Sequence, residues 1–169
     1  MEDSQIGTVS TEPVTFLVSS RHLILASPVF KAMLIGGWKE GDKTNGPLQA
    51  GAEDWDIEAM LVVMNVLHNR CRQVPRKVSL DMLAKIAVIV DHYKIHEALE
   101  IMTPLWIKAL KKALPTSPGM GITLWILVSW VFGDASVFRQ VTRVAILYGK
   151  KDITIPYELP IPLAIIGRF

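Results

Sequence analysis

The apolar residues of this chain recur at helical spacing in several separate stretches. In residues 20–34, Ser27 and Pro28 separate two short helical segments, because serine caps helix N-termini and proline suits the first helical position. Gly36 and Gly37 are expected to end the second segment. Its apolar positions, spaced to lie on one face for burial, are Val29, Phe30, Met33 and Leu34.

Two longer helices are predicted next. Asp54 and Asp56 favour a helix start, and the helix should end near Arg70. Ser79 caps a second helix, whose residues 80–90 are apolar nearly all round, so we expect this helix at the centre of the fold. The apolar stripe of the first helix is Ile57, Met60, Leu61, Met64, Leu67 and His68.

The last third of the chain is also helical in pattern. Pro104 should begin a fresh helix, because proline cannot continue one without losing a hydrogen bond. Residues 114–121 form the best linker, and residues 122–132 are strongly apolar. Asp134 then caps a final helix. The stripe of that helix is Val137, Phe138, Val141, Val144, Ala145 and Tyr148.

Strand patterns are scarce by comparison. Residues 14–18 are β-rich, and residues 47–50 could supply a second short strand. The predicted fold class is therefore α+β and mostly helical, with a small sheet near residues 14–18 and a helical extension at the C-terminal end.

A longer motif runs through the N-terminal third. A strand precedes His22 and a leucine-rich turn, and S-P-V-F and a hydrophobic pair follow, with the match continuing from Gly36 to Glu40. This pattern resembles the BTB/POZ domain, in particular the fungal proteins that carry it. Shorter similarities to fungal members occur at Asp54–Asp56, Leu67–Arg70, Val74–Pro75 and Ala87–Tyr93.

The resemblance also implies a domain organisation. Residues 1–12 are expected to be loose, residues 13–103 form the BTB/POZ-like domain with its small sheet, and residues 104–169 form the C-terminal helical extension.

BTB/POZ domains are protein-protein interaction modules, and some act as substrate adaptors for cullin-type ubiquitin ligases. Such adaptors carry a hydrophobic-x-Glu triplet after the helix that matches residues 28–34, and Trp38 and Glu40 fall at those positions. The resemblance therefore implies that these two residues bind protein, with a cullin as one partner. Three alternatives stay open: Trp38 covers the domain's own core, the domain serves homo-oligomerisation or scaffolding, for example as a homodimer, or the chain is an uncharacterised enzyme.

Residues that could carry catalysis do not form a recognisable set. There is no phosphate-binding glycine loop, nucleophile triad or paired carboxylate, so we expect no enzyme activity and no cofactor. His92 and His96 are four apart and would share a helix face, but no third metal ligand is apparent. Cys71 is interpreted as a free thiol in a loop.

Charge and composition narrow the partners further. The net charge is only +2, and the two basic clusters lack interleaved aromatic residues, which disfavours nucleic acid. Residues 122–132 are too short an apolar run to span a membrane. Residues 1–12 lack a signal pattern and the chain has one cysteine, so we expect an intracellular location, cytoplasmic or nuclear. The basic clusters are Arg70, Arg72, Arg76 and Lys77, and Lys108, Lys111 and Lys112.

Overall fold

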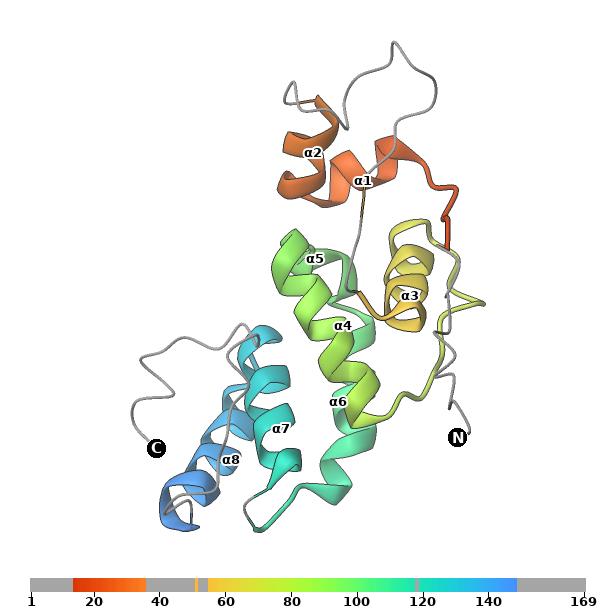
Figure 1. Cartoon of the computed structure of the whole chain (residues 1–169). Coiled ribbons are helices and arrows are strands. Elements are labelled where there is room, and N and C mark those ends of the chain that lie inside the picture. The colour runs from red at the N-terminus through yellow and green to blue at the C-terminus, as the bar shows by residue number, and fades with distance from the viewer. Residues whose placement is uncertain (1–13, 36–50, 52–54, 118, 149–169) are drawn as a thin grey trace, which may run out of the picture.

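The computed structural model of the chain describes residues 14–35, 51, 55–117 and 119–148. Helices make up most of these residues (Figure 1). In chain order they are α1 (Ser20–Ala26), α2 (Pro28–Ile35), α3 (Ile57–Leu67), α4 (Leu80–Tyr93), α5 (His96–Leu99), α6 (Met102–Leu110), the 3₁₀ turn η2 (Lys111–Ala113), α7 (Met120–Val131) and α8 (Ala135–Tyr148).

The prediction of a small sheet is wrong for the part of the chain that the structure describes. Residues 14–18 belong to no helix or strand, and the second predicted strand, residues 47–50, lies outside the described residues. A β-rich sequence forms a stable strand only when another strand satisfies its backbone groups. Leu17 is 98% exposed, whereas Phe16 and Val18 pack against the core. The expectation of a mostly helical fold is confirmed.

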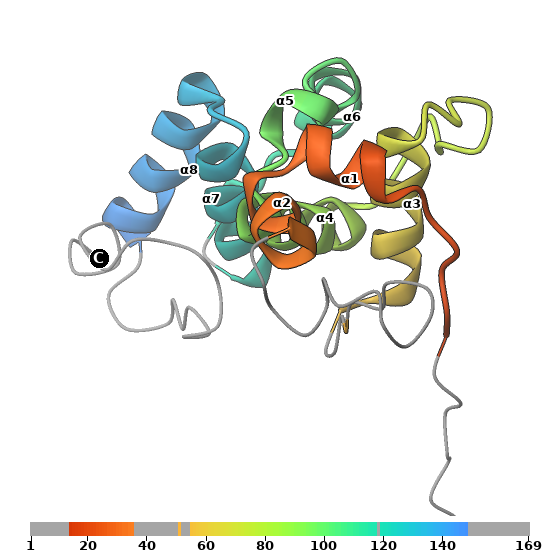
Figure 2. The same ribbon diagram turned by 90° about the horizontal axis from the view of Figure 1, so that it is seen from above.

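Helix α4 lies at the centre of the molecule, as its apolar sequence predicts. It contacts α2, α3 and α7, and Figures 1 and 2 show these helices arranged around it. Half of its residues are buried: Leu83, Ala84, Ile86, Ala87, Ile89, Val90 and Tyr93.

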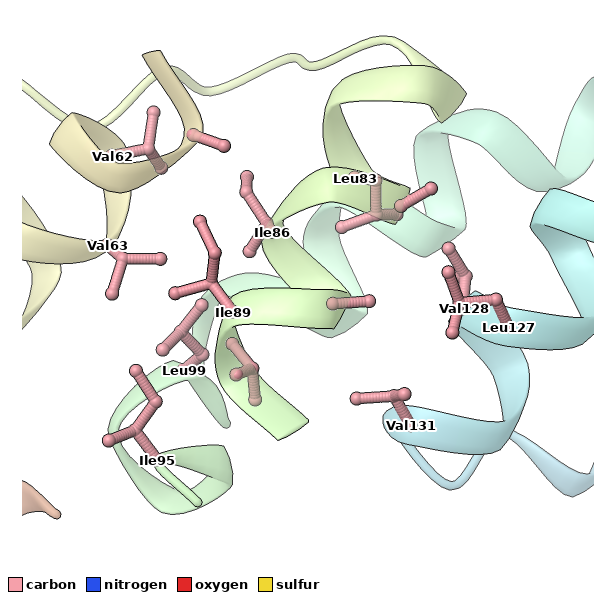
Figure 3. Close-up of a cluster of buried hydrophobic side chains, with 14 of the residues drawn as sticks. Val62, Val63, Leu83, Ile86, Ile89, Ile95, Leu99, Leu127, Val128 and Val131 are labelled. Atoms are coloured by element: carbon pink, nitrogen blue, oxygen red, sulfur yellow. The ribbon is translucent and has the colours of Figure 1, made fainter. Parts of the chain in front are cut away.

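The core continues on both sides of α4. Figure 3 shows Ile86 and Ile89 facing Val62 and Val63 of α3, while Leu127 and Val128 of α7 approach α4 from the other side. One hydrophobic cluster includes residues of α1 through α8. Both predicted parts of the chain, before and after residue 104, contribute to this cluster. The division of the chain at residue 104 stays a prediction.

Local capping explains where the helices begin. The backbone N–H groups of Ala59, Met82 and Val137 donate to the side chains of Asp56, Ser79 and Asp134 at 2.9, 3.1 and 3.0 Å. These bonds satisfy amide groups that have no partner within the helix, and they confirm the three predicted starts.

Two predicted helix boundaries are shifted. Helix α6 begins at Met102, two residues before Pro104, because proline is tolerated throughout a first turn whose N–H groups have no intrahelical acceptor. Helix α3 ends at Leu67, three residues before Arg70, and Asn69 takes a left-handed conformation (φ 54°) that cannot continue the helix.

The buried face of α3 also differs from the predicted stripe. Ile57 and Leu61 are 49% and 46% exposed, whereas Val62 and Val63 are buried. Helix α3 contacts α1, α4 and α5, so neighbours on several sides bury more of its surface than a single stripe provides.

Helices α7 and α8 form a tight hairpin. Gly133 has φ 68°, which permits the sharp turn, and the Asp134 N–H donates to the Ser129 carbonyl at 2.9 Å. Helix α7 packs between α4 and α8, so Trp125 is buried. The large exposed apolar side chains of α7 are limited to Met120 and Trp130.

A partly buried ion pair joins η2 to the start of α8. The Lys111 Nζ lies 2.6 Å from Asp134 Oδ2, and the Ser136 hydroxyl donates to Asp134 Oδ1 at 2.9 Å. Burial by itself raises the pKa of the Asp134 carboxyl, but the hydrogen bonds from Lys111, the Val137 N–H and Ser136 outweigh it. The net result is a pKa below the usual 3.8.

The central position of α4 predicts a large cost for truncating its side chains. Ile86→Ala should lower the free energy of unfolding by about 2 to 5 kcal/mol, because it leaves a cavity beside α3. Ile101→Ala is the matched control, since Ile101 is 81% exposed and should cost under about 1 kcal/mol. Urea denaturation measures both, and equal losses would contradict the described core.

The Lys111–Asp134 pair predicts a pH dependence of stability. Because the carboxyl pKa is lower in the folded state, the pair stabilises the protein above the unfolded value of 3.8, and this contribution is lost as the pH falls through the folded pKa. Asp134→Asn should keep the helix cap and cost about 0.5 to 1 kcal/mol at neutral pH. The difference from wild type should shrink at acidic pH.

Thermal denaturation between pH 7 and pH 2 measures this effect. The control is Asp81→Asn, because the Asp81 side chain is 65% exposed and its pairing with Lys85 is screened by solvent. A pH-independent loss for Asp134→Asn would argue against the ion pair.

Candidate functional site

The predicted protein-binding residues, Trp38 and Glu40, lie outside the described residues. The structure does describe the helix pair that leads to them. Helix α2 ends at Ile35, three residues before Trp38, and the Ile35 side chain is 62% exposed. The contacts that α1 and α2 make with α3 and α4 therefore determine how firmly this part of the chain is held.

Ser27 connects α2 to the end of α4. Its hydroxyl oxygen accepts the Phe30 N–H at 3.0 Å, which confirms the predicted cap, and the same hydroxyl donates to the Tyr93 carbonyl at 2.5 Å. Ser27 is only 1% exposed, so both bonds are shielded from water. A buried hydroxyl that lost its partner would carry an uncompensated desolvation cost.

An aromatic cluster adds to this contact between α2 and the end of α4. The Phe30 and Tyr93 rings stack with centroids 4.1 Å apart and planes 9° from parallel. Trp55 contacts both Tyr93 and His92, at 5.9 and 5.0 Å between centroids. Burial raises the pKa of the Tyr93 hydroxyl, and its hydrogen bond with Trp55 only partly offsets that rise. Packing and hydrogen bonding thus hold α2 against α4.

His68 provides a second polar contact, between the end of α3 and the start of α1. The Ser19 N–H donates to His68 Nε2 at 2.8 Å, and His68 Nδ1 lies 2.8 Å from the Met64 carbonyl. Because Nε2 accepts a hydrogen bond here, this arrangement requires the tautomer that carries its proton at Nδ1. His22 is exposed, and its ring centroid lies 5.0 Å from that of His68.

Large apolar side chains remain exposed on the outer surface. Near the helix pair they include Leu17, at 98%, and Leu25, at 87%. Further along the chain, Ile101 and Leu105 are 81% and 57% exposed; Ile101 directly precedes α6, and Leu105 lies four residues later, within the helix. Exposed apolar surface of this kind marks candidate contact sites for other proteins.

This exposed pair at the start of α6 was not predicted from the sequence. Its i, i+4 spacing is visible in the sequence, but the same spacing is also typical of a buried stripe. Only the position of α6 against the body distinguishes the two.

The remaining chemical candidates are separated in the structure. His92 and His96 do not share a helix face, because Lys94 is left-handed (φ 54°) and ends α4 between them. Cys71 is exposed, and its thiol donates to Asn69 Oδ1 at 3.2 Å. Within the described ranges, no three His, Cys, Asp or Glu residues come together as a metal site.

Two further observations bear on the class of protein. Among the described residues, no helix is long and apolar enough to cross a membrane. Comparison with protein-family models, with curated proteins and with solved structures finds no match for this chain.

The double role of Ser27 predicts that its removal costs more than the loss of an ordinary cap. Ser27→Ala should lower the free energy of unfolding by about 2 to 3 kcal/mol, because the Tyr93 carbonyl and the Phe30 N–H both lose a partner. Ser79→Ala removes only an exposed cap and should cost about 1 kcal/mol. Chemical denaturation compares the two variants, and a Ser27→Ala cost no larger than that of Ser79→Ala would contradict a tertiary role for the hydroxyl.

Proposed function

We propose that this chain is a protein-protein interaction module of the BTB/POZ type that acts as a substrate adaptor for a cullin-type ubiquitin ligase. The proposal rests on the motif that runs from His22 to Glu40 and on the way α1 and α2 are held. It includes no catalytic role for the chain and no cofactor.

The observation that carries the proposal is the rigid anchoring of α2. The Ser27 hydrogen bonds and the Phe30–Tyr93 stack tie this helix to the central helix α4. A segment that continues from a fixed helix loses less conformational entropy on binding than one that continues from a loose helix. Trp38 and Glu40 follow α2 directly in the sequence, so this anchoring favours their use as contact residues.

The two residues have different proposed roles. Trp38 can bury a large flat side chain in a partner pocket, as the central anchors of protein interfaces do. Glu40 can orient the partner through a charge-assisted hydrogen bond. The exposed Ile101 and Leu105, at the start of α6, supply further apolar area for such a contact.

Homo-oligomerisation is the second candidate function, and a different surface favours it. Near the end of α8, Ile146 and Leu147 are 62% and 59% exposed. Two copies that cover these residues would remove apolar surface from water. Light scattering distinguishes this role, since an oligomer lost in Ile146→Ser/Leu147→Ser would support it.

The adaptor role predicts cullin binding that depends on Trp38. In a pull-down and in a titration by calorimetry, wild type should bind, and Trp38→Ala should weaken binding by about 2 kcal/mol, or roughly thirtyfold. Glu40→Ala should have a smaller effect in the same direction. Failure of the folded wild-type protein to bind any cullin would exclude the adaptor role.

The matched control for this experiment is Trp130→Ala. Trp130 is 44% exposed on α7, so its removal tests whether loss of any exposed tryptophan weakens binding. Circular dichroism and thermal unfolding of each variant establish that it remains folded.

A further inference from the structure

The loop between α3 and α4 carries an unusual density of positive charge. Residues 69–78 contain four cationic side chains and no acidic residue. All four side chains belong to exposed residues: Arg70, Arg72, Arg76 and Lys77. Because the whole chain has a net charge of only +2, this loop is a local concentration of charge rather than part of a uniformly basic surface.

The backbone of this loop is held in place at both ends and in its middle. The Arg70 N–H donates to the Asn65 carbonyl at 2.8 Å, and the Gln73 N–H donates to the Arg70 carbonyl at 2.8 Å. Val74 is buried at 5% exposure. The Pro75 carbonyl accepts the indole N–H of Trp106 at 2.8 Å, which fixes the loop to α6. The four cations therefore extend from an ordered scaffold.

None of the four cations takes part in an ion pair with another residue that the structure describes. The described ion pairs use Lys85, Lys94, His96 and Lys111 instead. Asp81, the first acidic residue after the loop, is paired with Lys85. Figures 1 and 2 show the loop projecting from the α3 side of the molecule, away from α8.

We propose that this basic loop, residues 70–77, binds an acidic peptide segment of a partner protein. Three of its four cations are arginines, whose planar guanidinium groups bind carboxylates through two parallel hydrogen bonds. The cations lie within one short loop rather than along an extended stripe, which suits a few carboxylates better than a nucleic-acid backbone. No aromatic residue within the loop could stack on a base.

This inference goes beyond the adaptor role, because the basic loop and the Trp38 segment are different parts of the chain. An acidic peptide could bind the loop whether or not a cullin is the partner of Trp38. Failure of cullin binding therefore leaves the peptide site standing, and the reverse also holds.

The test measures binding of a fluorescein-labelled oligoglutamate peptide to the full chain by fluorescence anisotropy at low ionic strength. The loop variant is Arg70→Gln, Arg72→Gln, Arg76→Gln and Lys77→Gln combined. We expect it to bind the peptide at least about tenfold more weakly than wild type. An oligoglutamine peptide of the same length should not bind either protein, since it carries no charge.

The control variant removes the same charge elsewhere on the exposed surface. It combines Arg21→Gln, Lys31→Gln, Arg139→Gln and Arg143→Gln, all at exposed positions, and should bind within about twofold of wild type. Both variants are checked for folding by circular dichroism and thermal unfolding.

Three results would overturn the proposal. The first is no binding of the oligoglutamate peptide by wild type, and the second is an equal loss in the loop and control variants, which would indicate net charge alone. The third is tighter binding of a DNA duplex of matched charge than of the peptide, with loss in the loop variant, which would assign the loop to nucleic acid.

Discussion

The burial of helix α4 is the interaction on which the rest of this structure depends. A helix that is apolar on nearly every side cannot rest on a surface, because any uncovered side would expose apolar area to water. Helices α2, α3 and α7 all contact it, and Ile86 and Ile89 are completely buried. Each of these neighbours then covers α4 with one face and leaves another for further contacts, as α7 does with α8.

Hydrogen bonds between segments far apart in the sequence complement this apolar core. The Ser27 hydroxyl binds the Tyr93 carbonyl across 66 positions, and Ser19 binds His68 across 49. Hydrophobic burial is not directional, so it brings helices together without fixing their ends. A buried hydrogen bond is directional, so it fixes the positions of the two groups that it joins. Its loss is costly because it leaves a desolvated polar group. These two hydrogen bonds hold α1 and α2 at the edge of the fold.

The surface features that suggest function are placed around this core on different elements. Exposed leucines lie next to and within α1, an exposed apolar pair begins α6, and the basic loop leaves the α3 side of the molecule.

The sequence by itself determined the features that depend on near neighbours. The caps at Ser27, Asp56 and Ser79 follow from residues within three positions, and the central place of α4 follows from its largely apolar sequence. The prediction that Trp38 and Glu40 are contact residues also rests on a local motif, and it stays a prediction. Each of these patterns can be read within a few turns of helix.

Only the tertiary structure decided the features that depend on residues far apart in the chain. Residues 14–18 have a strand pattern but form no strand, because the described chain offers no partner for their backbone. Leu61 is partly exposed while Val62 is buried, and Leu105 is exposed despite its helical spacing. Periodicity gives the residues that share a helix face, but the packing of the neighbouring helices selects which face is buried.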